Sequence, residues 1–339
     1  MLLGTFVDHG GALLKFVFLN SIDDYWLEKL EYLKQRFSED SFITGRDHPD
    51  SCELIEEADA LITGRLPDED LRRAKKLKAI FVPWTGVNNL PLNSLKERGI
   101  VVSNNHGNAA IVAERAIALA LAVTGRVVFL HNEMARGIWP GRTDDRDTSW
   151  FSIQGKTCAI LGLGQIGIRI AKILKAFDCK VLGYRRDLSK GKPDHVDVLA
   201  DSFQDAIKSS AIVFLAMPLT DDTRGLIDVG VLKNMKDKFL VNISRGEIID
   251  EKALFDALKN GTLAGAAIDT WYHYPSRKHP VVFPSKYPVH TLPNIVMSPH
   301  VASWTPEGIR LMIDETVKSI ESYILKGRPM YEVDLDLTY

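Results

Sequence analysis

Thr157-Cys-Ala-Ile-Leu-Gly162-Leu-Gly164-Gln-Ile-Gly167 is the stretch of sequence that decides the fold. Its first five residues predict a buried strand, and the residues after Gly164 have the periodicity of a helix over 165–177. Glycines spaced G-x-G-x-x-G between a strand and a helix are typical of a loop that binds a dinucleotide. We expect Gly162 to permit the tight turn, Gly164 to admit a pyrophosphate, and Gly167 to let the helix pack on the strand.

The first turn of the predicted helix completes this phosphate site. Backbone N–H groups and the positive end of the helix dipole both attract negative charge. The residues assigned to cofactor binding here are Gly162, Gly164, Gln165, Ile166 and Gly167. A glycine-rich turn without a ligand is the alternative interpretation.

Two arginines, Arg185 and Arg186, follow the next predicted strand at 181–184. A site for NAD(H) usually has Asp or Glu about 20 residues beyond the glycines, where it binds the ribose hydroxyls. Arg185 stands 23 residues after Gly162 instead, and guanidinium groups form charge-assisted hydrogen bonds with a 2′-phosphate. We therefore predict a preference for NADP(H), with NAD(H) as the alternative, because the geometry of the loop can also decide. A solvated basic loop is the other interpretation.

Strands and helices alternate on both sides of the glycine loop. Beyond 157–161, strands are predicted at 181–184, 212–216, 239–243, 266–268 and 295–297, which gives the six strands expected of a dinucleotide-binding sheet. Before it, strands are predicted at 16–19, 60–63, 80–82 and 100–102, with helices over 23–36, from Pro67 onward and over 92–98. A long helix is predicted from about 108 to 136, and a last one from Pro306 to Leu325, ended by Gly327. This order predicts an α/β fold in which helices cover parallel sheets.

Length, charge and cysteine count limit the classes of function that the chain can have. A length of 339 residues favours two domains. A formal charge of −2 leaves no positive excess for binding nucleic acid or an anionic membrane. The three cysteines form no C-x-x-C pair, so neither a disulfide framework nor a Cys-rich zinc site is expected, and we predict no metal.

Two apolar stretches raise the question of a signal or a membrane helix. The first stretch, residues 1–19, has no basic segment before Lys15 and is interrupted by Asp8 and His9, which does not fit a secretory signal. The second, 109–129, contains three charged side chains, which does not fit a membrane-spanning helix. We therefore expect a soluble, cytoplasmic protein.

Six segments of the chain form an ordered set of motifs, namely NAAIVAE at 108–114, GLGQIG at 162–167, MPLTDDT at 217–223, VNISRG at 241–246, GAAID at 265–269 and SPH at 298–300. In this order they resemble the motifs of the D-isomer-specific 2-hydroxyacid dehydrogenase family, which includes glyoxylate/hydroxypyruvate reductases and phosphoglycerate dehydrogenases. The resemblance covers nearly the whole chain. It implies two Rossmann-like domains, with a dinucleotide-binding domain of residues 105–304 inserted into a flavodoxin-like substrate domain of residues 1–104 and 305–339. It also implies a homodimer.

The resemblance implies the catalytic residues as well. Arg245 matches the arginine that holds the substrate carboxylate, a task that suits the planar fork of a guanidinium. His300 matches the acid/base histidine, because an imidazolium can protonate an alkoxide and neutral imidazole can take the proton back. Asp269 matches an aspartate on the nicotinamide side, although an aspartate that only ends a strand is possible, and Ile243 is assigned to the cofactor site.

One position departs from the family. An acidic residue usually follows the aspartate by five positions and pairs with the catalytic histidine, and this sequence has Tyr274 there. A phenol offers a neutral hydrogen bond where a carboxylate would raise the histidine pKa. We therefore predict a lower pKa for His300 than in relatives that carry the acid, and we place Tyr274 with the catalytic residues.

The substrate side of the resemblance lies near the N-terminus and before the long helix. The segment Trp84-Thr85-Gly86-Val87 matches a loop whose backbone N–H groups bind the substrate carboxylate, and Asn108 matches an amide that touches substrate. The function predicted is reduction of a small 2-oxo acid to a D-2-hydroxy acid, or the reverse. The alternative is a catalytically weak binding protein that senses the dinucleotide, which the missing acid makes admissible.

Overall fold

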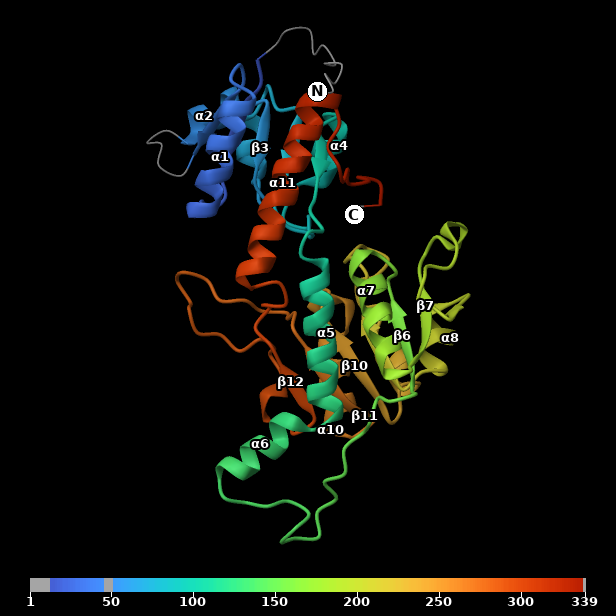
Figure 1. The fold of residues 1–339 in the computed structure, drawn as a ribbon. Coiled ribbons are helices and arrows are strands. Elements are labelled where there is room, and N and C mark those ends of the chain that lie inside the picture. Colours follow the sequence, from blue (N-terminus) through green and yellow to red (C-terminus); the bar gives the residue numbers. More distant parts are fainter. Residues whose placement is uncertain (1–12, 46–50, 338–339) are drawn as a thin grey trace. The chain divides into compact units, whose positions relative to one another are not determined.

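The structure, a computed structural model, describes residues 13–45 and 51–337. Residues 1–12, which include most of the segment weighed above as a signal, lie outside the described residues. The chain divides into two compact units, unit 1 with residues 1–108 and 305–339 and unit 2 with residues 109–304. The sequence analysis placed this division at 104/105 and 304/305. Unit 2 is therefore one continuous segment, and unit 1 is built from both ends of the chain (Figure 1).

Unit 1 is a parallel sheet in the order β2-β1-β3-β4-β5. Its strands are β1 (Lys15–Phe18), β2 (Ser41–Thr44), β3 (Ala60–Ile62), β4 (Ala79–Phe81) and β5 (Val101–Ser103). Its helices are α1 (Asp24–Arg36), α2 (Ser51–Glu57), α3 (Asp68–Arg73), α4 (Leu92–Glu97) and α11 (Pro306–Lys326). The order 2-1-3-4-5 is that of flavodoxin-like folds, so the predicted fold of this half is confirmed.

Local sequence explains where the helices of unit 1 begin and end. The Asp23 side chain accepts a hydrogen bond from the Trp26 N–H and caps α1, and Thr305 caps α11 in the same way. Gly327 ends α11 with a φ of 72°, the left-handed conformation predicted for it. The sequence analysis did not predict β2 and α2. β2 is a four-residue edge strand in which Phe42 alone is buried, so its apolar signal is weak.

Unit 2 is a parallel sheet in the order β12-β11-β10-β9-β6-β7-β8. Its strands are β6 (Thr157–Leu161), β7 (Lys180–Tyr184), β8 (Val198–Leu199), β9 (Ile212–Leu215), β10 (Lys238–Asn242), β11 (Leu263–Ile268) and β12 (Ile295–Met297). The six predicted strands are present, and the two-residue β8 was too short to predict. The predicted α/β fold class is therefore confirmed.

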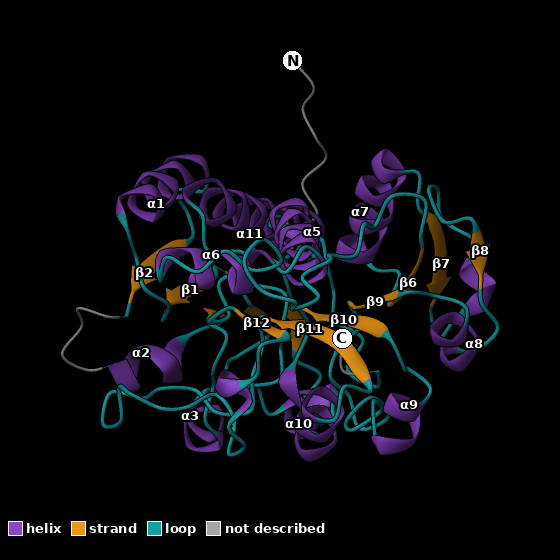
Figure 2. Cartoon of the chain, turned by 90° about the horizontal axis from the view of Figure 1, so that it is seen from below, coloured by secondary structure: helices purple, strands orange, loops and turns teal. Residues whose placement is uncertain are grey.

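Helices cover both faces of this sheet (Figure 2). They are α5 (Ala109–Thr124), α6 (Val127–Ala135), α7 (Gln165–Leu174), α8 (Phe203–Lys208), α9 (Val229–Lys233) and α10 (Glu251–Lys259). Apolar side chains of α5 and α7 form one buried cluster with the sheet, and those of α8, α9 and α10 form the other. The site therefore rests on a sheet that is packed on two sides, which is why its strands read as continuous apolar runs.

The prediction of one long helix over 108–136 is wrong at one point. α5 ends at Thr124 and α6 begins at Val127, because Arg126 has a φ of 50°. Glycine at position 125 is a poor helix former, so the chain turns where helix propensity is lowest. The helix predicted over 165–177 also changes character, since α7 ends at Leu174 and a 3-10 turn covers 175–177. Of the helices in 13–45 and 51–337, none is both long and apolar enough to cross a bilayer.

Candidate active site

The carboxyl ends of the strands of unit 2 bring most of the predicted residues to one edge of its sheet. Gly162 follows β6, Arg185 follows β7, Arg245 follows β10, Asp269 follows β11 and His300 follows β12. The chain runs from β6 to β7 on one side and later returns to β9 on the other side of β6. Ligands of open parallel sheets bind at such a reversal, outside the carboxyl ends of the strands.

The glycine loop at this reversal has the geometry of a phosphate site. Gly162 has a φ of 107°, and a Cβ there would lie 2.5 Å from the carbonyl oxygen of Ala216. A Cβ on Gly167 would lie 2.0 Å from the carbonyl oxygen of Gly162, so the close approach of α7 requires glycine. A Cβ on Gly164 would meet no atom within 4 Å. Gly164 therefore faces open space at the start of α7, where no side chain caps the helix, and the loop fits a dinucleotide.

The two arginines after β7 have different surroundings. Arg185 is half-buried, and its guanidinium lies 3.4 Å from the carbonyl oxygens of Leu163 and of Gly191. It is therefore tied to the glycine loop itself. Arg186 is exposed, and its Nη1 lies 3.6 Å from the Oδ2 of Asp222, in the loop after β9. The sequence analysis did not foresee this carboxylate, because it is distant along the chain.

Arg245 is a half-buried cation at the end of β10. Its Nη1 donates to the carbonyl oxygen of Ser244 at 2.7 Å, and no carboxylate of the described residues lies within 4.0 Å of its guanidinium. Burial lowers its pKa, opposed by Tyr274 and Glu247. A guanidinium held away from water without a carboxylate partner is favourable only if an anion completes it.

His300 sits in a strained loop after β12. Its φ is 58°, and a residue other than glycine in that region costs about 1–3 kcal/mol. His300 is an exposed residue, yet its partial burial lowers its pKa, as does the charge of Arg245, while Asp269 opposes the shift. The charge of Arg245 thus acts on His300, although the two residues are 55 positions apart in the sequence.

Asp269 holds the backbone of the loop that carries His300. Its side chain is completely buried, and its Oδ1 accepts from the Ser298 hydroxyl and from the Val301 N–H at 3.1 Å. Its Oδ2 accepts from the Ala302 N–H at 3.1 Å. Each carboxylate oxygen thus has a donor from the segment 298–302. This placement gives Asp269 a structural task that the sequence analysis weighed only as an alternative to a contact with the cofactor.

Tyr274 occupies the position of the missing acid. Its ring centroid lies 5.5 Å from that of His300, and its hydroxyl accepts from the Trp271 N–H at 3.0 Å. Burial raises the Tyr274 pKa, so the phenol stays neutral near neutrality. The next residue toward the N-terminus, His273, turns the other way, with its Nε2 3.8 Å from Glu251. Of the described carboxylates, none lies within 4.0 Å of His300.

The remaining predicted residues lie in or beside other elements. Ile243 is buried directly after β10, two residues before Arg245. In unit 1, the Thr85 hydroxyl donates to the Asn105 carbonyl at 2.8 Å. Within the described part of the chain, the N–H groups of Thr85 and Gly86 have no protein acceptor. Asn108 is buried, with its amide nitrogen 3.1 Å from the sulfur of Met312 and its amide oxygen without a partner among the described residues.

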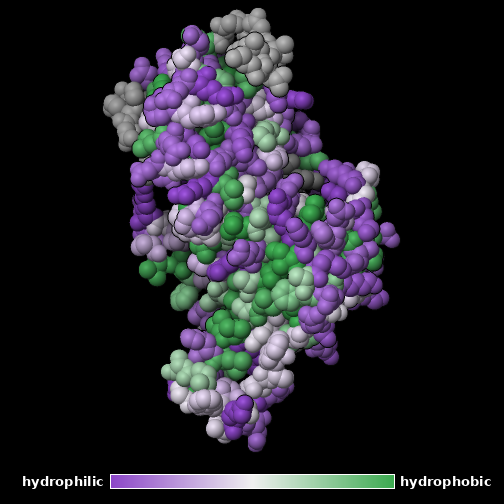
Figure 3. Space-filling view, viewed as in Figure 1, coloured by the Kyte–Doolittle hydropathy of each residue, from purple (hydrophilic) through white to green (hydrophobic). Residues whose placement is uncertain are grey.

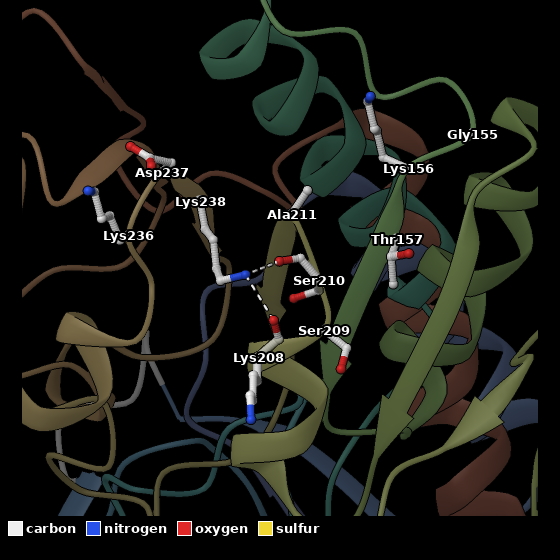
Figure 4. Close-up of a pocket in the computed structure, with 10 residues that line it drawn as sticks. All are labelled: Gly155, Lys156, Thr157, Lys208, Ser209, Ser210, Ala211, Lys236, Asp237 and Lys238. Carbon is white, nitrogen blue, oxygen red and sulfur yellow. Dashed lines mark hydrogen bonds between the residues drawn. The ribbon is translucent and has the colours of Figure 1, made fainter.

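A hollow lies at the opposite edge of the unit 2 sheet (Figure 4). It has a volume of about 430 Å³ and is lined by residues 155–157, 208–211 and 236–238, at the amino ends of β6, β9 and β10. Lys238 crosses it and donates to the carbonyl oxygens of Lys208 at 3.1 Å and Ser210 at 2.5 Å. The ammonium groups of Lys156, Lys208 and Lys236 point in different directions (Figure 4). None of the predicted site residues lines this hollow.

The carboxyl edge can now be compared with known proteins. Residues 117–302 match the sequence profile of the NAD binding domain of the D-isomer specific 2-hydroxyacid dehydrogenases. This range contains the glycine loop, Arg245 and His300. The chain belongs to the D-isomer-specific 2-hydroxyacid dehydrogenase family.

Relatives of this dehydrogenase family resemble the chain over most of its length. A D-3-phosphoglycerate dehydrogenase of Archaeoglobus fulgidus is 32% identical over 311 residues, which are 89% of this chain and 56% of that protein. The chain thus spans about half the length of the phosphoglycerate dehydrogenases it matches. A glyoxylate reductase of Thermofilum pendens is 32% identical over 273 residues, 79% of this chain and 77% of that enzyme. A solved acyclic imino acid reductase in complex with NADPH and D-Arg superposes with a TM-score of 0.78 at 26% identity, covering 94% of this chain and all of that one.

Proposed function

We propose that the protein reduces a small 2-oxo acid to a D-2-hydroxy acid with NADP(H) as the preferred cofactor, or catalyses the reverse. The observation that carries the proposal is the half-buried Arg245 guanidinium, which has no carboxylate partner among the described residues and which acts on the pKa of His300. A cation in this state fits an anionic substrate, and a histidine beside it fits proton transfer to that substrate.

The side chains of the protein account for binding and proton transfer. The Arg245 fork is suited to hold the carboxylate and to draw electron density from the neighbouring carbonyl. His300, when protonated, gives its proton to the alkoxide oxygen that forms, and in the reverse reaction it takes that proton. A nicotinamide dinucleotide supplies or accepts the hydride when it is bound. Tyr274 contributes a neutral wall against the imidazole rather than a charge.

In unit 1 we assign Thr85, Gly86 and Asn108 to substrate binding. The support is that the N–H groups of the 85–86 loop and the amide oxygen of Asn108 have no partner among the described residues. Free N–H groups bind carboxylate oxygens, as backbone nests do.

A substrate panel tests the activity. Glyoxylate, hydroxypyruvate, pyruvate and longer 2-oxo acids are offered with NADPH and NADH in parallel, and oxidation of the cofactor is followed at each. We expect turnover with at least one small acid and its loss by about 10²–10⁴-fold in His300→Ala. Tight dinucleotide binding without turnover on any acid would instead support the sensing protein, which the replacement of the acid by Tyr274 makes the second candidate.

Cofactor preference is tested separately. The support for NADP(H) is Arg185, held against the carbonyl of Leu163 in the glycine loop without a carboxylate within 4.0 Å in the described chain. One charge-assisted hydrogen bond is worth about 1.5–3 kcal/mol, so Arg185→Asp is expected to lower the ratio of NADPH to NADH affinity by about 10–100-fold. Lys208→Asp, at the opposite edge of the sheet, is the matched control. An unchanged ratio in Arg185→Asp would remove the phosphate assignment.

We further propose a homodimer formed through α6 and the segment 136–150. This segment extends away from the unit 2 sheet (Figure 1), and apolar surface gathers over α5 and α6 (Figure 3). The exposed apolar side chains on α5, α6 and the segment are Leu121, Val127, Val128, Met134, Trp139 and Trp150. Ion pairs hold the segment 136–150 against α6, since Glu133 pairs with Arg136 at 2.9 Å and with Arg146 at 2.8 Å. A preformed apolar surface fits a second copy of the chain.

Light scattering tests the dimer. We expect twice the chain mass for the protein and the mass of one chain for Val127→Glu combined with Trp139→Glu, because two buried charges oppose association. Val229→Glu, an equally exposed valine on α9, is the control. A single-chain mass for the unmodified protein at micromolar concentration would exclude the dimer.

A further inference from the structure

We propose that Arg115 and Ser298 are positioning residues that hold His300 in its working orientation. This inference rests on the proposed function, since it assigns the support of the proposed acid. It concerns three elements that lie far apart in sequence, namely α5, the end of β11 and the loop after β12. The contacts that connect them all lie within unit 2.

The Ser298 hydroxyl is the centre of the connection. It donates to Oδ1 of the buried Asp269 and accepts from Nη2 of Arg115 at 3.1 Å. The Ser298 carbonyl accepts from the Trp271 indole N–H at 2.8 Å. Ser298 is almost completely buried, so water does not replace these partners. Both roles of the hydroxyl, donor and acceptor, are therefore used two residues before His300.

The loop beyond Ser298 depends on the same carboxylate. The N–H groups of Val301 and Ala302, on the far side of His300, both donate to Asp269. His300 is thus flanked on each side by residues fixed to one side chain, and its own backbone is left-handed. A strained conformation persists only where its surroundings determine it. The contacts of Asp269 are what determine it here.

Arg115 contributes a positive charge to the hydrogen-bonded group of Ser298 and Asp269. Asp269 is completely buried, and the Arg115 guanidinium donates to the Ser298 hydroxyl, which in turn donates to Asp269. Arg115 comes from the second turn of α5, so it fixes the distance between this helix and the loop. Loss of the guanidinium would remove the donor to the Ser298 hydroxyl, which itself donates to the buried carboxylate, and the loop would be free to relax.

The test is titration of His300 followed by NMR, with the resonance assigned by its loss in His300→Gln. Burial is the largest cause of the lowered His300 pKa, so a loop that relaxes into water should release it. We expect Ser298→Ala to raise the His300 pKa toward the ordinary value of about 6.5. Ser298→Thr keeps the hydroxyl and is expected to leave the pKa near that of the unmodified protein. Equal titration curves for the protein and Ser298→Ala would overturn the proposal.

Kinetics provide the second readout. Misplacement of a catalytic group by about 1 Å costs about 10²-fold in rate, so Ser298→Ala should lower kcat by about 10–100-fold while the dissociation constant for NADPH stays unchanged. A general loss of structure would weaken NADPH binding as well, and that result would count against positioning. Ser298→Thr should restore most of the rate.

Arg115 is tested with a matched pair on the same helix. Arg115→Leu should raise the His300 pKa and lower kcat, by less than Ser298→Ala because Asp269 keeps its hydroxyl donor, and Arg115→Lys should recover part of both. Glu114→Gln changes the adjacent residue, which is exposed as Arg115 is, and should change neither the His300 pKa nor kcat. If no 2-oxo acid is turned over, the proposed function fails, yet the His300 titration still decides whether Arg115 and Ser298 position the ring.

Discussion

The two edges of the seven-stranded sheet in unit 2 both carry cationic side chains, but these side chains have different hydrogen-bond partners. At the amino edge, the Lys238 ammonium crosses a hollow and donates to two carbonyl oxygens. The other lysines there are exposed and point apart. At the carboxyl edge, the half-buried Arg245 guanidinium has the carbonyl of Ser244 as its one hydrogen-bond partner among residues 13–45 and 51–337. His300, whose pKa Arg245 lowers, has a left-handed backbone.

The difference teaches which features indicate chemistry. The half-buried Lys238 ammonium of the hollow already donates to two backbone carbonyls, so its charge does not require a ligand. A half-buried Arg245 with no carboxylate partner in the described chain, acting on a strained His300 of shifted pKa, is an arrangement that folding alone does not favour. The amino edge is therefore a structural feature, and we place the function at the carboxyl edge.

Removing the cation of the carboxyl edge should give the largest effect. Arg245→Ala is expected to lower kcat/KM for the 2-oxo acid by about 10²–10³-fold or more, the usual cost of losing a donor aimed at developing charge. Arg245→Lys should recover little, because a point charge cannot replace the planar fork. Steady-state kinetics and a separate NADPH titration measure this. If NADPH affinity collapses while turnover of the bound complex persists, Arg245 supports the fold instead.

A smaller effect is expected from returning an acid to the carboxyl edge. The His300 pKa is lowered in the protein, and reduction needs the protonated ring, so its rate should fall as pH rises through this low pKa. A carboxylate in Tyr274→Glu favours the imidazolium and raises the pKa. The falling limb of the pH profile should then move to higher pH. Tyr274→Gln is the control, since it adds no charge, and superimposed profiles for Tyr274→Glu and the unmodified protein would contradict the prediction.

A substitution at the amino edge should lower the stability of the protein and leave its rate of turnover unchanged. Lys238→Met leaves the carbonyl oxygens of Lys208 and Ser210 without their donor, which should lower the free energy of unfolding by about 1–2 kcal/mol. Urea unfolding measures this loss, and kcat should be unchanged. Lys236→Met, an exposed neighbour without such bonds, should leave both quantities unchanged. A large loss of activity in Lys238→Met with normal stability would contradict the assignment of the amino edge to structure and of the carboxyl edge to function.

The sequence predicted the parts of the site that local spacing determines. The glycine loop is one, because Gly162 and Gly167 are required by contacts within one strand, turn and helix. The ends of the strands are another, because apolar runs identify β10 and β12 and therefore the edge at which Arg245 and His300 lie.

The parts that the sequence did not predict depend on contacts between distant segments. Arg115 and Ser298 are 183 residues apart, and nothing near either one indicates the other. The pairing of Arg186 with Asp222 has the same character. The break at Arg126 is a different case, since its left-handed backbone overrides the helical periodicity of the residues around it.

The discontinuity of unit 1 has a consequence for how the protein is made. Ile313, Val317 and Ile320 of α11 pack in the same apolar cluster as Phe16 and Phe18 of β1. A ribosome therefore releases the first half of this core long before the second half exists, and the whole of unit 2 is synthesised in between. Until the last helix emerges, this face of the nascent N-terminal sheet has the contacts of α1, whose Trp26 and Leu30 lie in the same cluster, but lacks those of α11.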